Sequence, residues 1–372
     1  MTSLSTSASL AMPAARAEAA TGAPLLVLSG RGAPPCAVDD FNRRLAAALG
    51  ASGIVVLEDT TAGALWEAVG RARGVVASFP VVAWKRALLR PLLALALARV
   101  RKRSAVVVLH EWASLNRLRR LALLPALALA SRVVLLSPTV RAEVAADPLA
   151  RPSLKRAALA PLAPNLGAPP AVAPSALAAR LAEARAAGRL VVGHFGSIYA
   201  GKGPETMLAV AAALKARGAR PLLVFVGDFI RSAERIEAVF AARVAALGLQ
   251  DDVVVSGYVA GMPELYGLFA EVDAFAYAFA EGLTARRSSV LASVQSGRPV
   301  VVTGPARPDE FDHHPRYAAL VAGGALSLVP RDATPDDFAR AIIAAAGRPT
   351  VAAAIDLDAW WADTAVAVRA AA

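Results

Sequence analysis

Two segments of the sequence carry residues that could bind a phosphate group. In the first, an apolar run ends at Gly196, Ser197 follows it, and Lys202 comes just before a glycine and a proline. Proline is typical of the first turn of a helix, and the N–H groups of a helix start together with a lysine favour an anion. No Ser or Thr follows the Gly-Lys pair, so the segment is neither a Walker loop nor a dinucleotide fingerprint. Taken alone, it is more typical of an ordinary strand-to-helix turn with an exposed lysine.

The second segment begins with an acidic residue, Glu281, that leaves the end of an apolar run. Arg286 and Arg287 follow, just before a predicted helix that Ser288 or Ser289 would cap. Two adjacent arginines suit a bidentate hold on phosphate oxygens. As a solvated basic turn they would be unfavourable, because positive charge at a helix start opposes the macrodipole. This local conflict favours a phosphate-binding role for the segment.

Short β-branched runs alternate with Ala- and Leu-rich helical patterns through most of the chain, and they set the positions of these segments. The runs that predict strands are Leu25–Ser29, Ile54–Glu58, Val75–Ser78, Ala105–Leu109, Arg132–Leu136, Leu190–Phe195, Leu222–Val226, Val253–Ser256, Ala274–Tyr277 and Pro299–Val302. The patterns that predict helices are Val38–Leu49, Ala64–Ala72, Leu115–Ala130, Pro204–Arg217, Ala233–Leu247 and Ser288–Ser296. Continuous apolar strands joined by long crossovers predict parallel sheets covered on both faces.

The alternating pattern restarts after a proline-rich stretch, which predicts two domains. The expected fold class is α/β, with two facing Rossmann-like, doubly wound domains built on mainly parallel sheets. Ligands of such sheets bind beyond the carboxyl ends of the strands, so we expect the site between the domains. The uncharged stretch 157–179 is predicted to be a linker. The expected parts are a disordered N-terminal tail (1–24), an acceptor-side domain (25–168), a nucleotide-sugar-binding domain (169–355) and a C-terminal helix (356–372) that could cross back onto the first domain.

The net charge of +11 comes entirely from the first half of the chain. Residues 1–188 hold 23 basic and 10 acidic side chains, whereas residues 189–372 hold 17 and 19. Basic residues flank short apolar runs, which suits the headgroup region of an anionic membrane; the alternative is a pair of core helices with solvated basic ends. These basic residues are Lys85, Arg86, Arg90, Arg99, Arg101, Lys102, Arg103, Arg117, Arg119 and Arg120.

Several classes of protein are excluded by composition and pattern. The apolar runs are too short for a membrane span, which needs roughly 18 residues or more. No signature of a nucleic-acid-binding module is present, so we expect no nucleic-acid partner. The single cysteine, Cys36, excludes internal disulfides and a cysteine-based zinc site, and it suits the cytoplasm.

The ordered set of motifs resembles the group-1 (family 4) retaining glycosyltransferases, which have the GT-B fold. The motifs that carry the resemblance are Gly196-Ser-x4-Lys202-Gly, Val226-Gly227-Asp228, Val255–Val259, Glu281-Gly and Gly297-x-Pro-Val-Val, with a looser match at His110-Glu-Trp. The resemblance implies that the second domain binds a UDP- or GDP-linked sugar and that the first presents a glycan or lipid-linked acceptor. It implies no cofactor besides the nucleotide sugar as substrate. No Asp-x-Asp pair occurs in a metal-binding context, so we expect no metal at the site.

The resemblance also implies roles for individual residues. Lys202 matches the lysine that holds the diphosphate, and Glu281 matches a catalytic-site glutamate that contacts the donor sugar. His110 falls where the family often has a histidine that touches the transferring sugar. A histidine after a strand is more often structural, and only the resemblance favours a catalytic role. The segment Ser256-Gly257-Tyr258 matches the loop near the nucleotide base.

Two positions depart from the family pattern. Ser289 stands where a second glutamate usually grips the ribose, and Ser197 stands where an arginine usually precedes the lysine. Our hypothesis is that Arg286 or Arg287 supplies the missing phosphate charge, and that Ser288 and Ser289 supply hydroxyl contacts.

These departures leave two functions open. The first is a cytoplasmic enzyme of polysaccharide or glycolipid assembly that transfers a hexose with retention of configuration, attached peripherally to the inner face of the membrane. The second is a catalytically impaired GT-B protein that acts as a scaffold and binds sugar nucleotides.

Overall fold

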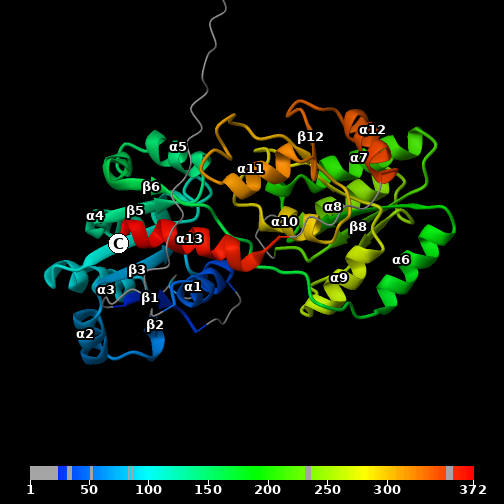
Figure 1. The fold of residues 1–372 in the computed structure, drawn as a ribbon. Coiled ribbons are helices and arrows are strands. Elements are labelled where there is room, and N and C mark those ends of the chain that lie inside the picture. Colours follow the sequence, from blue (N-terminus) through cyan, green and yellow to red (C-terminus); the bar gives the residue numbers. More distant parts are fainter. Residues whose placement is uncertain are drawn as a thin grey trace, which may run out of the picture.

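The structure of the protein is a computed structural model that describes residues 24–31, 36–50, 53–82, 84, 87–230, 236–348 and 355–372. The expected tail, apart from residue 24, lies outside the described residues, as do Lys85 and Arg86 of the basic group. The described chain forms two lobes, each built on a six-stranded parallel sheet with helices on both faces (Figure 1). The predicted α/β fold with two Rossmann-like domains is therefore confirmed.

The first lobe has the strand order β2-β1-β3-β4-β5-β6, with every pair parallel. Successive side chains of β1 face opposite sides, as a strand requires: Val27 packs with Phe41, and Leu26 with Leu65. The elements are β1 (Leu25–Ser29), α1 (Ala37–Ala48), β2 (Gly53–Val56), α2 (Ala62–Arg71), β3 (Gly74–Phe79), α3 (Leu89–Val100), β4 (Ser104–Leu109), α4 (Arg117–Leu129), β5 (Arg132–Leu135), α5 (Pro138–Ala146) and β6 (Ala157–Leu159). Short 3-10 turns span Leu57–Asp59 and Arg151–Arg156.

The second lobe has the strand order β12-β11-β10-β7-β8-β9, again all parallel. The chain moves outward from β7 in one direction and then returns to β10 on its other side, so the strand order reverses between β7 and β10. Its elements are α6 (Ala176–Ala186), β7 (Leu190–Phe195), α7 (Pro204–Ala216), β8 (Pro221–Val226), α8 (Ile236–Ala246), β9 (Val253–Val255), α9 (Met262–Ala270), β10 (Ala274–Tyr277), α10 (Ser288–Gln295), β11 (Val300–Thr303), α11 (Pro315–Ala322), β12 (Leu326–Val329) and α12 (Pro335–Ala346). In such sheets the point of reversal is where a ligand binds.

Two short edge strands lie where none was predicted. The linker prediction for 157–179 is wrong at both ends. Its first three residues form β6, which pairs with β5 through Leu135 and Leu159, and its last four residues belong to α6. β12 pairs with β11 over four residues. Three or four residues, rich in alanine in β6, carry no local strand signal, so pairing with the neighbouring strand decides their conformation.

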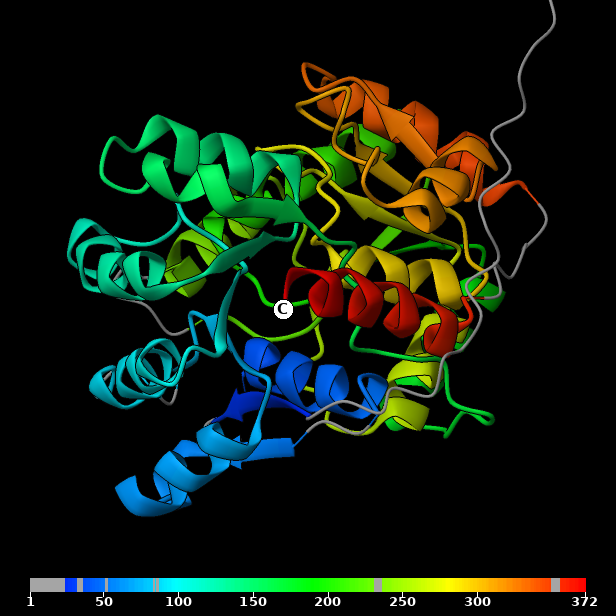
Figure 2. The ribbon, with the colours of Figure 1, turned by 60° about the vertical axis from the view of Figure 1, so that its left-hand side comes forward.

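The last helix, α13 (Leu357–Ala371), packs on the first lobe although it follows the second in sequence. Trp361 lies 5.4 Å from the Phe41 ring of α1, and Arg369 donates to the Leu49 carbonyl at 2.9 Å. Thr364 donates to the carbonyl of Pro161 in the connection between the lobes. Figure 2 shows α13 beside α1. One apolar cluster runs from β1 and α1 through α13 to α9 and α10, so the two lobes share a core.

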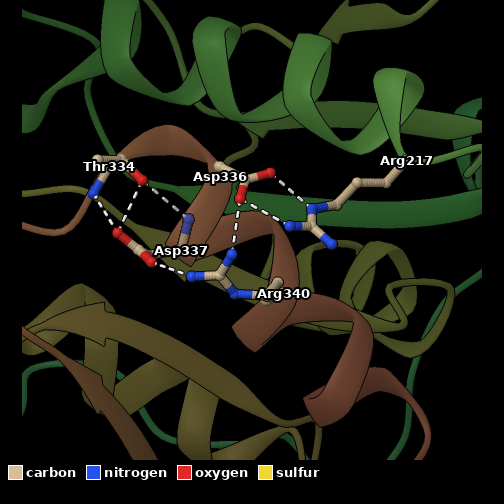
Figure 3. A network of polar contacts seen from close by, with 5 residues as sticks. All are labelled: Arg217, Thr334, Asp336, Asp337 and Arg340. Atoms are coloured by element: carbon tan, nitrogen blue, oxygen red, sulfur yellow. Dashed lines mark hydrogen bonds and ion pairs between the residues drawn. The ribbon is translucent and has the colours of Figure 1, made fainter.

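A polar network fastens α12 to α7 on the outer face of the second sheet (Figure 3). Thr334 and Asp337 form a capping box at the start of α12. Arg217, just after α7, makes two hydrogen bonds of 2.6 Å to Asp336, and Arg340 bridges Asp336 and Asp337. These contacts hold α7 against the sheet, so that its first turn stays at the end of β7.

None of the helices that the structure describes is both long and apolar enough to cross a bilayer.

Candidate functional site

The carboxyl edges of the two sheets face each other, and the contacts between the lobes lie there. Arg286, after β10, donates to the carbonyl of His110, after β4, at 2.9 Å. Glu310, after β11, accepts hydrogen bonds from the N–H and the hydroxyl of Thr139 at the start of α5, at 3.2 and 2.6 Å. Glu310 is fully buried, and burial raises its pKa. These two contacts place the loops after β4, β5, β10 and β11 around one site.

Lys202 is a buried cation at the point where the strand order reverses. It ends a short 3-10 turn (Ala200–Lys202), and only 9% of the residue is exposed. Its Nζ lies against the backbone of Gly196, where a side-chain carbon would overlap it. Among the residues that the structure describes, Nζ has neither a hydrogen-bond acceptor nor an ion-pair partner. An unpaired buried cation is costly, so this amine is available for an anion.

Gly203, the N-cap of α7, brings that helix start to the end of β10. Its φ is +66°, a left-handed conformation that favours glycine. A side-chain carbon at this position would overlap the carbonyl oxygen of Ala278. The close approach therefore requires glycine here, and it places the first turn of α7 beside the loop that carries Glu281.

Arg287 joins the two phosphate-binding candidates. Its guanidinium pairs with the Glu281 carboxylate, lies 4.4 Å from the centre of the Phe279 ring and donates to the Tyr199 hydroxyl at 3.4 Å. Burial, followed by the positive charge of Arg287, lowers the pKa of Lys202 from 10.5 to about 8. The two cations are therefore close enough to repel each other in the absence of an anion.

The prediction that Ser288 or Ser289 caps α10 is wrong. Arg287 is the N-cap residue, and no side chain caps this helix. The Arg287 N–H donates to the Thr284 carbonyl, and this turn makes Arg287, rather than a serine, the residue that precedes the helix. Arg287 cannot cap the helix with its side chain, because a guanidinium has no acceptor for the helix N–H groups. Ser289 lies next to Gly196, on the side of Lys202, whereas Ser197 is exposed.

The Ser256-Gly257-Tyr258 segment is held against the loop after β8. The Ser256 hydroxyl accepts from the Gly227 N–H at 3.0 Å and donates to the Gly257 carbonyl at 2.7 Å. Gly227 in turn packs on the carbonyl of Gly196. Tyr258 is 75% exposed, so its ring is free to stack on a ligand.

His110 lies on the first lobe's side of the site, where its ring is held in the neutral form. The ring packs edge-on against Phe41 at 4.7 Å, and its Nε2 is buried without a hydrogen-bond partner among the described residues. Burial, followed by the charge of Arg286, lowers the pKa of His110 to about 3. At neutral pH the imidazole is therefore an uncharged hydrogen-bonding group.

Comparison with known protein families gives a match for the second lobe. Residues 189–348 match a family model described as "Glycosyl transferases group 1". This part of the chain is therefore similar to the group 1 glycosyltransferases. The resemblance that the sequence motifs indicated is confirmed for this domain. A comparison with curated protein sequences found no match.

Several solved structures share the whole two-lobe fold. HepE from Anabaena, in complex with UDP, is 17% identical with a TM-score of 0.59, over 93% of this chain and 94% of that chain. A glycosyltransferase from Rickettsia africae ESF-5 is 12% identical (TM-score 0.54; 95% and 93% covered). Sucrose-phosphate synthase from Thermosynechococcus elongatus is 15% identical (TM-score 0.54; 94% and 93% covered). The chain thus has the GT-B fold.

The structure adds site residues that the sequence reasoning missed. Tyr199 and Phe279 hold Arg287, and Glu310 ties the lobes together. Tyr199 lies between Gly196 and Lys202 in the first motif, so its position in that loop could have predicted a place in the site. Glu310 carried no local signal, because its partner Thr139 is 171 positions away. Within the described part of the chain, no group of three or more His, Cys, Asp or Glu could hold a metal ion.

If the site takes a nucleoside diphosphate such as UDP, the affinity is expected to fall as the pH rises above about 8. A diphosphate stabilises the charged form of Lys202, so binding raises the pKa of this amine above its free value of about 8. Between about pH 7 and 8 both the amine and the terminal phosphate of UDP are charged, so the affinity is at its plateau. Above pH 8, each pH unit weakens binding up to tenfold until the pKa of the bound state is reached. Calorimetric titration with UDP from pH 6.5 to 9.5 measures this profile. A flat profile across this range would contradict a role for Lys202 in binding the diphosphate.

Proposed function

We propose that the chain is a retaining glycosyltransferase that takes its sugar from a UDP-linked donor. The observation that carries the proposal is the buried, unpaired Lys202 beside Arg287 at the reversal point of the second sheet. UDP is preferred to GDP as the first nucleotide to test because HepE, which has the same fold, was solved with UDP.

Transfer builds negative charge on the departing diphosphate, and the site supplies cations for it. Cleavage of the sugar–phosphate bond leaves oxocarbenium character on the sugar and puts the bonding electron pair on the phosphate oxygen. Lys202, Arg287 and the N–H groups at the start of α7 would stabilise that charge without a metal ion. Positioned groups of this kind act most strongly where water is excluded, which suits a lysine that is 9% exposed.

Two further groups would act on the transferring sugar. Glu281, already paired with Arg287, would contact the donor sugar. The neutral imidazole of His110, with its free Nε2, would hydrogen-bond the same sugar from the opposite lobe. Retention of configuration is part of the proposal through the resemblance to the group-1 family.

The acceptor is proposed to be a glycan or lipid-linked molecule presented at a membrane. On the first lobe α3 and α4 are neighbours, and their exposed leucines alternate with arginines. Leu89, Leu118 and Leu121 are 81%, 79% and 57% exposed. This pattern supports peripheral attachment to the inner face of the cytoplasmic membrane. Flotation with anionic vesicles tests the attachment, and absence of binding at low salt would refute it.

One experiment separates the enzyme from a catalytically impaired scaffold. Calorimetry with UDP and GDP measures nucleotide binding, and an assay of UDP-glucose hydrolysis measures turnover without an acceptor. The enzyme predicts binding of UDP and slow release of glucose. Binding without turnover of this or other UDP-sugars would favour the scaffold, and failure of both nucleotides to bind would overturn the proposal.

A further inference from the structure

An apolar cavity of about 160 Å³ opens at the carboxyl end of β3, between α3 and α4. Its walls are mostly apolar and include Phe79, Val81, Trp84, Leu88, Leu115 and Leu123. An engineered apolar cavity of about 150 Å³ holds a benzene molecule, so this one has room for about six carbon atoms. The cavity is not used by any step of the proposed sugar transfer.

Two polar groups on the cavity wall have no partner among the described residues. Trp84 is 2% exposed, and its Nε1–H makes no hydrogen bond. Arg119 is exposed at the cavity, and no contact of its guanidinium is found in the described part of the chain. A buried indole N–H normally finds an acceptor. A ligand that combines an apolar chain with an anionic head would fill the apolar cavity and pair with Arg119.

The cavity adjoins the side of the site where an acceptor must lie. The carbonyl of Phe79, a wall residue, accepts from the His110 N–H at 2.9 Å. Leu115, on another wall, belongs to the loop that follows His110, and its N–H donates to Trp112. The cavity therefore lies beside the end of β4 and the loop that carries His110.

The outer rim of the cavity continues into the exposed leucines of α4. Leu118 and Leu121 flank Arg119 in sequence and are largely exposed. Exposed apolar side chains beside a cation suit the surface from which an amphiphile would arrive.

We propose that this cavity binds the apolar chain of an amphipathic acceptor, with an anionic head at Arg119. The inference rests on the proposed function in taking this amphiphile as the acceptor. It selects a lipid-linked acceptor over a soluble polysaccharide.

Chain-length dependence tests the proposal without any activity measurement. Calorimetry measures binding of butyl, hexyl and octyl phosphate below their micellar concentrations, with inorganic phosphate as the chainless probe. Each buried methylene contributes about fourfold in affinity, so affinity is expected to rise up to about six carbons and then level off. Inorganic phosphate is expected to bind at least 100-fold more weakly than hexyl phosphate.

Two alanines of α4 provide a matched pair of variants. Ala122 is exposed and lines the cavity, so Ala122→Phe is expected to block it without disturbing the core and to weaken hexyl phosphate at least tenfold. Ala128 is exposed on the same helix and does not line the cavity, so Ala128→Phe is expected to bind as the wild type does. Arg119→Gln is expected to weaken hexyl phosphate but not hexanol.

The outcomes separate this proposal from the proposed function. Equal affinities for butyl and hexyl phosphate, or wild-type binding by Ala122→Phe, would overturn the cavity assignment. UDP binding is measured in each variant and is expected to be unchanged. If the alkyl phosphates follow the predicted pattern while UDP does not bind, the cavity assignment stands and the sugar-transfer proposal fails.

Discussion

Replacing Lys202 with methionine is expected to lower kcat by about 10²–10³-fold. The amine is the buried, unpaired cation beside Gly196, where the leaving diphosphate is proposed to lie. Loss of one positioned group that stabilises transition-state charge typically has an effect of this size. Steady-state kinetics with the donor identified by the hydrolysis assay gives kcat and KM.

The same substitution is expected to stabilise the fold. The lowering of the Lys202 pKa from 10.5 to about 8 corresponds to about 3 kcal/mol of unfavourable burial at pH values where the amine is charged. This penalty is fully present below pH 8 and disappears as the pH rises to the ordinary lysine pKa. Methionine removes the charge and keeps an apolar stem of similar length. The expected rise in Tm at pH 7 is several degrees, because about 1 kcal/mol shifts a domain of this size by 2–4 °C.

Lys215→Met is the matched control, since Lys215 lies near the other end of α7 and pairs with Asp252 on the surface at 2.8 Å. Its kcat and Tm are expected to stay close to those of the wild type. A Lys202→Met protein with wild-type kcat would refute the catalytic role. A fall in both kcat and Tm would indicate that the lysine is structural.

Replacing Arg287 with methionine is expected to weaken UDP binding by about 10- to 100-fold. A hydrogen bond to a charged group contributes about 1.5–3 kcal/mol, and Arg287 is the guanidinium beside Lys202 in the site. Removal of this like charge is also expected to raise the pKa of Lys202, so the pH at which UDP affinity falls should move upward. Calorimetric titrations at several pH values measure both effects on one protein.

Arg286 and Arg243 provide the comparisons for Arg287. In Arg286→Met the loss of UDP affinity is expected to be smaller, because this guanidinium contacts the His110 carbonyl on the opposite lobe. Arg243→Met, on the exposed face of α8, is expected to bind UDP as the wild type does. A larger loss of UDP affinity in Arg286→Met than in Arg287→Met would indicate that Arg286, rather than Arg287, supplies the phosphate contact. Unchanged kinetics in both would refute the idea that either arginine replaces the family residue missing at Ser197.

The buried strands of both sheets could be predicted from local sequence. The runs Leu25–Ser29, Leu190–Phe195 and Ala274–Tyr277 are strands with the predicted bounds. Continuous apolar stretches are buried on both faces of a parallel sheet and leave few alternatives, so the local pattern and the final pairing agree. β6 lacks such a pattern, and only the edge of β5 made it a strand.

The candidate site was only partly predictable. The motif order placed Lys202 and Glu281 at strand ends, because the carboxyl edge of a parallel sheet gathers such loops. Three contacts could not be predicted from the sequence. They are the hydrogen bond of Arg286 across the interface, the Glu310–Thr139 contact, and the ion pair between Glu281 and Arg287. The helix-cap role expected of the serines was wrong for a similar reason, since the turn before α10 depends on how its loop packs.

The sequence by itself indicated the two parallel sheets, their connecting helices and the glycine-rich turns that present charge at the strand ends, since strand, helix and turn patterns and the lengths of the crossovers are local features. The tertiary structure decided which cation is buried and unpaired, which lobe each arginine reaches and where α13 packs. Burial and pairing depend on side chains that are far apart in the chain, and the free energy of a charge changes by several kcal/mol with its surroundings. Local sequence contains no measure of those surroundings.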